Sequence, residues 1–122
     1  MAQAFQDLTV WQRAVEMTVG AYALTSGFPA AGIYGLTSQM RRASVSVASN
    51  IAEGRGRLTE GEFRQFVGHA QGSNCELQTQ IEVARRLKFA TEEQLKNVAA
   101  LSVEVGKMLS ALIGTLTTKT RG

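Results

Sequence analysis

The stretch Tyr34–Gly54, YGLTSQMRRASVSVASNIAEG, decides the fold because it carries two stripes of residues at helical spacing. Apolar residues recur every three or four positions and predict a face that packs into a core: Leu36, Met40, Ala43, Val47 and Ile51. Polar residues recur beside them with the same rhythm: Gln39, Arg42, Ser46, Asn50 and Glu53. Gln, Ser and Asn on a helix indicate side chains that bond to another helix or to a ligand.

The chain before this stretch predicts a first helix from about Asp7 to Ser26, with Asp7 as its N-cap. One face of that helix carries Leu8, Trp11, Val15, Thr18 and Tyr22. Pro29 ends the segment, because proline disfavours a helical conformation of the residue before it. The second helix is expected from about Ile33 to Glu53, closed by glycines at 54 and 56.

Two more helices follow, and each opens on a threonine. Thr59 and Glu62 form a capping box, and the third helix is expected to run to about Leu87. Its apolar face consists of Phe63, Phe66, Val67, Ala70, Leu77, Ile81 and Ala84. Thr91, followed by acidic residues in the first turn, begins a fourth helix that is expected to fray after Thr117. Its apolar stripe consists of Leu95, Val98, Leu101, Val105, Leu109, Leu112 and Leu116.

The order of these segments predicts an all-α protein. Four helices joined by short connections favour an antiparallel up-down-up-down four-helix bundle, which we expect to be left-handed. Residues 1–122 are enough for one domain with its own core. A hydrophobic content of 44% with 19% charged residues is typical of a globular chain rather than a disordered one.

The second and third helices are expected to form a hairpin that brings their polar stripes together. Its antiparallel register pairs Gln39 with Glu76, Arg42 with Ser73, Ser46 with His69, and Asn50 with Gln65. Glycines at 68 and 72 cost about 1 kcal/mol each inside a helix, which a close approach of the two backbones would offset. We interpret the stripe as an interhelical hydrogen-bond network of Gln39, Arg42, Asn50, Glu53, Ser73 and Glu76. The alternative is a contact surface for a ligand or a nucleic acid.

Basic residues gather around this hairpin, and the net charge of the chain is +3. The candidate nucleic-acid-binding residues are Arg41, Arg42, Arg55, Arg57 and Arg64. Arginine suits phosphate because its planar guanidinium can bond bidentately. The alternative is that Glu53, Glu60 and Glu62 neutralise much of this charge and leave an ordinary solvated turn.

No arrangement of residues points to catalysis or to a metal. His69 is the only histidine, and Cys75, the only cysteine, is poorly spaced from it for shared coordination on one helix. A nucleophilic cysteine would need a base and an oxyanion hole, for which the sequence has no signature. We therefore expect no enzyme activity, no catalytic residues, no metal and no cofactor.

The sequence favours a cytoplasmic location. The opening MAQAFQDLTVW has neither the basic segment nor the apolar run of a signal peptide. A single cysteine fits a reducing cytosol. The apolar pattern near the C-terminus is interrupted by Glu104 and Lys107, so we expect it to be too amphipathic to span a membrane.

Several stretches together resemble a known family: FQDLTVWQRAVE (Phe5–Glu16), Phe28-Pro29, YGLTSQMRRA (Tyr34–Ala43), NIAEG (Asn50–Gly54) and AQGSNCELQTQIEVA (Ala70–Ala84). They resemble the four-helix-bundle proteins first noticed as reading frames in intervening sequences of bacterial 23S ribosomal RNA genes. The resemblance implies a ring-like homo-pentamer. The chain is also similar to accessory proteins of diversity-generating retroelements, which bind nucleic acid and a reverse transcriptase through a basic barrel.

Two classes of function follow. The first is a non-catalytic, oligomeric protein that binds RNA or DNA through the five arginines. The alternative is a protein–protein interaction scaffold, for a reverse transcriptase or another protein, in which the polar stripe is purely structural. Self-association is also favoured by apolar residues on two sides of the first helix. Trp11 and Tyr22 flank one side, and Val10, Ala14, Met17 and Leu24 line another.

Overall fold

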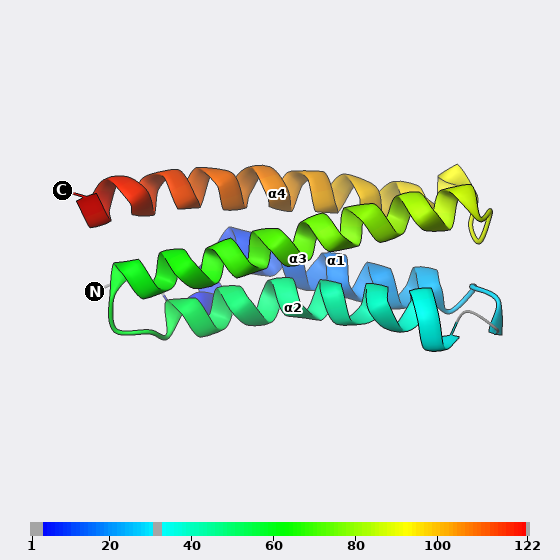
Figure 1. The fold of residues 1–122 in the computed structure, drawn as a ribbon, viewed down its shortest axis with the longest axis horizontal. Helices are drawn as coiled ribbons and strands as arrows, with labels where there is room; N and C mark the ends of the chain where they lie inside the picture. Colours follow the sequence, from blue (N-terminus) through cyan, green and yellow to red (C-terminus); the bar gives the residue numbers. More distant parts are fainter. Residues whose placement is uncertain (1–3, 31–32, 122) are drawn as a thin grey trace.

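The computed structural model describes residues 4–30 and 33–121, which form four long helices (Figure 1). The helices are α1 (Thr9–Thr25), α2 (Ser38–Arg55), α3 (Glu60–Arg86) and α4 (Glu92–Arg121). A short 3-10 turn, Phe5–Asp7, precedes α1, and a π-helical turn, Ile33–Thr37, leads directly into α2. The described residues contain no strand, so the all-α prediction is confirmed.

The helices lie along one long axis, and each packs against two others. Both α1 and α3 contact α2 and α4. In Figure 1 the chain crosses the molecule once with each helix, so that α1 and α3 run one way while α2 and α4 run the other. The predicted four-helix bundle is confirmed, whereas its left-handed twist stays a prediction.

Threonines cap two of the helices as the sequence predicts. The Thr59 hydroxyl accepts a hydrogen bond from the Glu62 N–H at 3.1 Å, which opens α3. Thr91 and Gln94 exchange two bonds at the start of α4. The Gln94 N–H donates to the Thr91 hydroxyl at 3.2 Å, and the Thr91 N–H donates to Gln94 Oε1 at 2.8 Å. These caps satisfy N–H groups that have no partner within the helix.

Two helix ends differ from the expectation. Asp7 is not the N-cap of α1, because it lies in the preceding 3-10 turn and Leu8 takes that position without a side-chain cap bond. At the other end of the chain, α4 continues past Thr117 to Arg121. A contact of 3.9 Å between Lys119 Nζ and a carboxylate of α3 accompanies this last turn.

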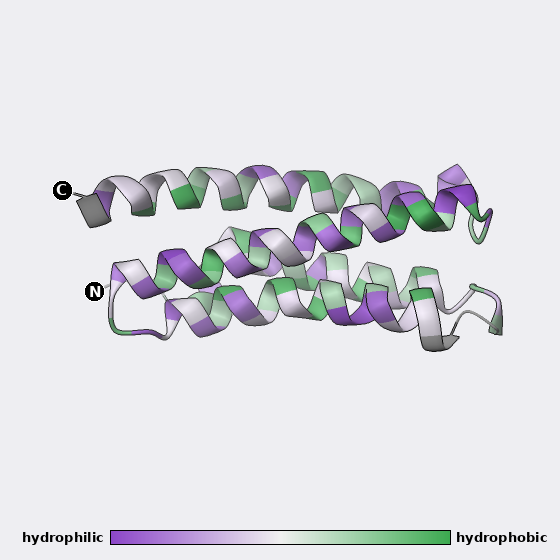
Figure 2. Ribbon diagram, in the orientation of Figure 1, coloured by the Kyte–Doolittle hydropathy of each residue, from purple (hydrophilic) through white to green (hydrophobic). Residues whose placement is uncertain are grey.

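The core is built from the apolar stripes that the sequence predicts for α2, α3 and α4. The buried members are Met40, Ala43, Val47, Ile51, Phe63, Val67, Ala70, Leu77, Ile81, Ala84, Leu95, Val98, Val105, Leu109 and Leu116. The partly buried members are Leu36, Phe66, Leu101 and Leu112. Figure 2 shows the resulting bands of hydrophobic and hydrophilic residues alternating along α2 and α3. The predicted core faces of these three helices are confirmed.

Of the two apolar sides of α1, the structure buries one. Its fully or nearly buried residues are Val10, Ala14, Met17, Ala21 and Thr25. The other side, with Leu8, Trp11, Val15, Thr18 and Tyr22, is only partly buried, and Tyr22 at its end is 43% exposed. Because α1 is apolar on two sides, helical spacing alone does not choose between them, and the face with the small alanines is the one that packs inward.

One glycine of the hairpin marks a close approach of α2 and α3. A Cβ atom added at Gly54 would lie only 2.6 Å from the Cβ of Phe66, so no other residue fits without movement of a helix. This glycine lies inside α2, which ends one residue later at Arg55. The close approach expected at Gly68 and Gly72 is wrong, because both are exposed and a Cβ there would have nothing within 4 Å.

The register of the hairpin differs from the expected one by about a helical turn. Ser46 lies opposite Ser73, with 2.8 Å between the two hydroxyl oxygens, and not opposite His69. Figure 1 shows why: the connection 56–59 continues beyond the end of α2 before the chain turns back. The first turn of α3 therefore extends past α2, and every later residue of α3 is shifted.

By length and composition, α4 could cross a membrane. Its segment Glu92–Lys119 contains an 18-residue window of mean hydropathy 1.4, of which 22% is buried in the bundle. Within this helix, Glu104 Oε2 lies 3.3 Å from Arg13 Nε of α1, in an ion pair whose two side chains are nearly half exposed. The expectation that the protein has no membrane partner stays a prediction.

Candidate nucleic-acid interface

Helices α2 and α3 pack along a line that we call the α2–α3 seam. Hydrogen bonds between small polar side chains connect the two helices at its centre. The Ser46 and Ser73 hydroxyls are 2.8 Å apart, and either of them can donate. Asn50 Nδ2 donates to the Ser46 carbonyl at 2.8 Å and to the Ser46 hydroxyl at 3.0 Å. Of the residues predicted to form the polar network, Asn50 and Ser73 are therefore joined, and Ser46 is the link between them.

Next to Ser46 the seam opens into a polar groove of about 420 Å³. Its lining residues are Gln39, Arg42, Ala43, Ser46, Glu76 and Gln80. Three predicted network residues, Gln39, Arg42 and Glu76, are exposed here, and none of them forms a hydrogen bond or ion pair with any residue that the structure describes. The structure thus brings these three together around an open groove and not in a closed network.

At the other end of the seam, two arginines lie against aromatic rings. The Arg57 guanidinium is 4.6 Å from the centroid of the Phe66 ring, and that of Arg55 is 5.6 Å from the Phe63 ring. Arg57 also pairs with Glu53, with 3.2 Å between Nη2 and Oε2. A guanidinium held over a ring keeps N–H groups in its own plane that can donate to phosphate.

The neutralisation of this hairpin by acidic residues is only partial. Glu53 pairs with Arg57, but both side chains are about half exposed, and an ion pair of this kind contributes little. Glu62 accepts a bond from the Thr59 hydroxyl at 3.2 Å, and Glu60 lies near Lys119 of α4. Neither therefore cancels an arginine of the hairpin.

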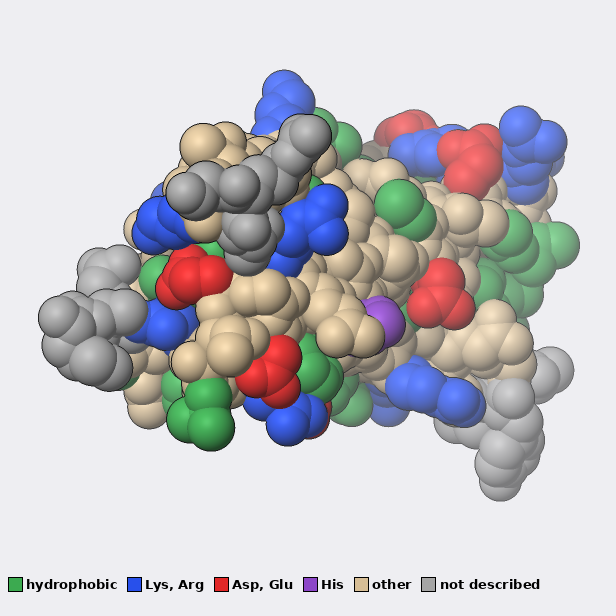
Figure 3. Space-filling view, turned by 60° about the vertical axis from the view of Figure 1, so that its left-hand side comes forward, with side chains coloured by type: hydrophobic (Ala, Val, Ile, Leu, Met, Phe, Trp, Pro, Cys, Tyr) green, Lys and Arg blue, Asp and Glu red, His purple; other side chains and the backbone are tan. Residues whose placement is uncertain are grey.

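The two remaining candidate arginines hold helices together. Arg41 Nε donates to the Thr25 hydroxyl of α1 at 2.9 Å, and its guanidinium lies 4.6 Å from the Tyr22 ring centroid. Arg64 Nε donates to the Thr117 hydroxyl of α4 at 2.7 Å. The five arginines therefore do not form one patch, and on the face drawn in Figure 3 basic and acidic side chains are interspersed.

A second polar contact, buried between α3 and α4, was not predicted. Asn74 Nδ2 donates to the Ser102 carbonyl at 2.9 Å, and the Ser102 hydroxyl donates to Asn74 Oδ1 at 2.7 Å. Both residues are almost fully buried. Gln71 Nε2 adds a bond of 2.8 Å to the Ser110 hydroxyl. The signal in the sequence was a serine on the apolar stripe of the fourth helix, one residue after Leu101.

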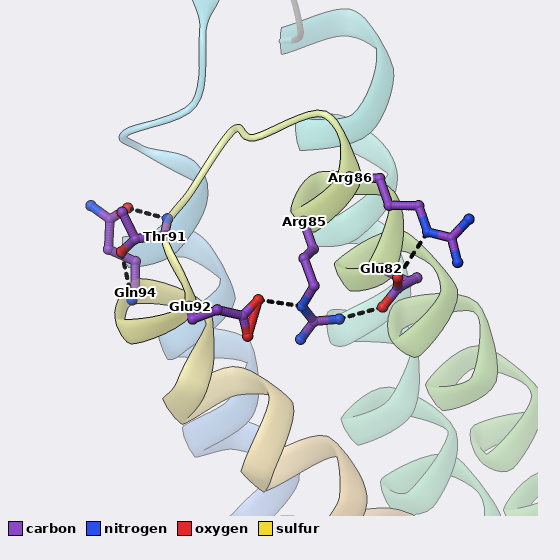
Figure 4. Close-up of polar contacts among 6 residues, drawn as sticks. All are labelled: Glu82, Arg85, Arg86, Thr91, Glu92 and Gln94. Atoms are coloured by element: carbon purple, nitrogen blue, oxygen red, sulfur yellow. Dashed lines mark hydrogen bonds and ion pairs between the residues drawn. The ribbon is translucent and has the colours of Figure 1, made fainter.

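Charged residues also meet at the turn between α3 and α4. Figure 4 shows Arg85 between Glu82 of α3 and Glu92 of α4, with hydrogen bonds to both carboxylates. Arg86 Nε donates to Glu82 Oε2 at 2.9 Å. The hydrogen bond from Arg86 has the larger effect in lowering the pKa of Glu82, and the bond from Arg85 lowers it further. In turn, the bond to Glu92 has the larger effect in raising the pKa of Arg85, and the bond to Glu82 raises it further. Arg85 and Arg86 are held by these carboxylates, so we exclude them from the candidate interface.

The residues considered for catalysis or metal binding lie on the outside of α3. His69 is exposed, with its ring 5.7 Å from the Phe66 ring in an edge-on arrangement. Cys75 is an exposed free thiol. Across the described ranges there is no group of three His, Cys, Asp or Glu side chains that could hold a metal ion.

Comparisons with known proteins place the chain in a family. No curated protein matches it. A crystal structure described as a protein of unknown function from the S23 ribosomal protein family of Bacteroides thetaiotaomicron is similar, with a TM-score of 0.78 and 21% identity. The similarity covers 86% of this chain and 98% of that one, and it supports the fold alone. The family described as 23S rRNA-intervening sequence protein matches residues 6–111. Because that match spans most of the sequence, the chain belongs to the 23S rRNA-intervening sequence protein family.

Proposed function

We propose that this protein is a non-catalytic nucleic-acid-binding protein that holds a single strand along the seam between α2 and α3. Arg42, Arg55 and Arg57 would contact phosphates. Arg41 and Arg64, which the sequence also suggested, would act in the bundle itself, because their guanidinium groups bond to neighbouring helices.

The observation that carries the proposal is the exposure of the arginines on this seam and the contacts that they form. Arg42 is exposed and has no acidic partner within the described residues, and Arg57 is held over the Phe66 ring. Arg42, Ser46, Asn50 and Glu53 follow helical spacing on one side of α2, and Arg57, in the connection after the helix, pairs with Glu53. The stretch from Arg42 to Glu53 rises roughly 17 Å along the helix axis, so the two arginines lie near the two ends of a path of about this length. A path of this length with positive charge at both ends suits a flexible phosphate backbone.

The test is binding of a fluorescent single-stranded RNA, measured by anisotropy at low salt. The double variant Arg42→Gln/Arg57→Gln should weaken binding by about tenfold or more, since each lost phosphate contact removes favourable charge interaction. The matched control is Lys96→Gln/Lys107→Gln, which makes the same change in net charge on α4 and should bind almost as well as wild type. If both variants lose affinity equally, overall charge explains the loss and the assignment to Arg42 and Arg57 is wrong. No binding by wild type would refute the proposal.

We also propose that the protein acts as a homo-oligomer, with a pentamer as the form that the family resemblance implies. The support comes from apolar residues left uncovered on α1 and α4. Val19 is 65% exposed, and it lines a shallow groove between the two helices with Val15, Ala23 and Leu101. Exposed apolar surface of this kind tends to mark an interface.

Light scattering tests this second proposal. A pentamer would have about five times the protomer mass of 13.1 kDa. Val19→Lys should shift the mass downward, because it places a charge in the expected interface, whereas Val45→Lys on α2 serves as the matched control. A mass of one protomer that does not change on concentration would refute self-association.

The alternative function is a scaffold that binds another protein, such as a reverse transcriptase. It is favoured by the structural use of Arg41 and Arg64, which removes two of the five arginines from any phosphate surface. A scaffold would bind its partner without a steep dependence on salt, whereas nucleic-acid binding weakens as salt rises.

A further inference from the structure

We propose that the polar groove on the α2–α3 seam binds a guanine base, with Arg42 and Glu76 contacting two adjacent edges of the ring. This inference rests on the proposed function, because the groove continues the seam along which the strand would lie. It adds base selectivity to a surface that otherwise contacts only phosphates, because at a guanine Arg42 contacts the base in place of a phosphate.

The first argument is that the groove holds opposite charges that do not pair. Arg42 comes from α2 and Glu76 from α3, and both line the same groove. Neither forms an ion pair or hydrogen bond with the other or with any other described residue. The groove therefore presents a fork of N–H donors and a carboxylate acceptor, both available to a ligand.

A second argument comes from an unsatisfied amide. Gln80 also lines the groove, and its Oε1 atom is buried and has no hydrogen-bond donor within the described structure. A buried acceptor without a partner is unfavourable by about 1–3 kcal/mol. The last torsion of a glutamine side chain is soft, so a small rotation can present this amide to a polar ligand.

Guanine matches this set of groups better than the other bases. Its O6 and N7 atoms are adjacent acceptors, which an arginine can contact with two hydrogen bonds. Its N1–H and N2–H groups are adjacent donors on the neighbouring edge, which a carboxylate can accept together. Cytosine lacks the pair of donors, and adenine and uracil lack both pairs.

The size and lining of the groove fit this ligand and disfavour a protein helix. Its volume of about 420 Å³ lies within the range of small-molecule sites. Ala43 is the one apolar residue among the six that line it. An amphipathic helix needs apolar anchor points, which this groove does not offer.

The experiment titrates ¹⁵N-labelled full-length protein with guanosine monophosphate and, separately, with the adenosine, cytidine and uridine monophosphates. Guanosine monophosphate should shift the side-chain amide signals of Gln39 and Gln80 and the Nε signal of Arg42 at the lowest concentration. Equal shifts by all four nucleotides would indicate phosphate contact alone and overturn the proposal. Absence of shifts in the groove would overturn it as well.

Two changes test the carboxylate contact. Glu76→Gln should bind guanosine monophosphate about tenfold more weakly, the value of one good base contact. Inosine monophosphate, which lacks the N2 amine, should bind wild type with a similar loss. Glu93→Gln, an exposed glutamate in the first turn of α4, is the matched control and should bind like wild type. If Glu76→Gln binds like this control, the assignment is wrong.

A second experiment distinguishes recognition of a base within a strand from recognition of a free nucleotide. It also distinguishes failure of this inference from failure of the proposed function. A ten-nucleotide uracil RNA is compared with the same RNA carrying one central guanine, by anisotropy. Tighter binding of the second RNA by wild type but not by Glu76→Gln supports base reading within a strand. Equal binding of both RNAs leaves the proposed function intact and overturns base reading in the strand. Guanosine monophosphate binding without binding of either RNA would retain the groove as a nucleotide site and refute the proposed function.

Discussion

Alanine substitutions at three glycines should change the stability of the bundle in opposite directions. Gly54 lies against Phe66, whereas Gly68 and Gly72 face open space on the outside of α3. None of the three has a positive φ, so glycine is not required by the backbone conformation at any of them. The sign of each effect therefore depends on what a new methyl group would meet.

The expected magnitudes follow from two terms. Alanine in place of glycine stabilises a helix by about 1 kcal/mol. At Gly54 the methyl carbon would lie 2.6 Å from Phe66 Cβ, an atom next to the backbone that cannot swing away. The two helices must separate locally, and overpacking of this kind costs typically 1–3 kcal/mol. Gly54→Ala should therefore lose about 1 kcal/mol net, and Gly68→Ala and Gly72→Ala should each gain about 1 kcal/mol.

The assay is thermal unfolding followed by circular dichroism at one protein concentration, because self-association makes Tm concentration-dependent. A change of 1 kcal/mol corresponds to about 4 °C in a domain of this size. Gly54→Ala should melt lower than wild type, and Gly68→Ala and Gly72→Ala should melt higher. If Gly54→Ala is stabilised as much as the other two, the close approach of α2 and α3 at this position is refuted.

Three further predictions concern polar groups. Asn74→Ala should destabilise the bundle by about 1–3 kcal/mol in denaturant unfolding, because it leaves the buried carbonyl and hydroxyl of Ser102 unpaired. An unchanged unfolding midpoint would contradict the contact between Asn74 and Ser102. Glu76→Ala should unfold like wild type, because this exposed carboxylate has no partner among the described residues, and a clear loss would show that it belongs to a structural network after all. Hydrogen bonds from Arg86 and Arg85 hold the pKa of Glu82 below its ordinary value of 4.5. The stability that these bonds contribute is therefore complete above pH 4.5 and is lost as the pH falls through the lowered pKa of Glu82. Wild type should therefore lose more Tm than Glu82→Gln on acidification below pH 4.5, and parallel curves would contradict the assignment.

The parts of the fold that the sequence predicts well are those determined by local spacing. Leu77 and Ile81 of α3 and Val105 and Leu109 of α4 repeat at helical intervals on one side of a helix, and all four are buried. Thr59 and Thr91 mark helix starts through short-range hydrogen bonds that involve residues three positions away. Such signals do not depend on the rest of the chain.

Features that depend on how two helices meet were harder to predict. The register of α2 on α3 follows from the path of the connection between them, and the spacing of residues within each helix does not predict that path. A glycine shows only that a side chain is absent, so Gly68 and Gly72 could not be distinguished in sequence from Gly54, which does lie at a contact. The five candidate arginines looked alike for the same reason, and only the positions of Thr25 and Thr117 show that Arg41 and Arg64 are used within the bundle.

The most direct test of the central claim, that the α2–α3 seam binds nucleic acid through Arg42 and Arg57, is the salt dependence of binding. The dissociation constant of a single-stranded RNA is measured over a range of salt for wild type, Arg42→Gln/Arg57→Gln and Lys96→Gln/Lys107→Gln. Each phosphate contact contributes about 0.7 to the slope of log K against log salt for a single strand, so the arginine variant should have a slope smaller by about 1.4. The lysine control should retain the wild-type slope. A slope that is the same for wild type and the arginine variant would contradict the account.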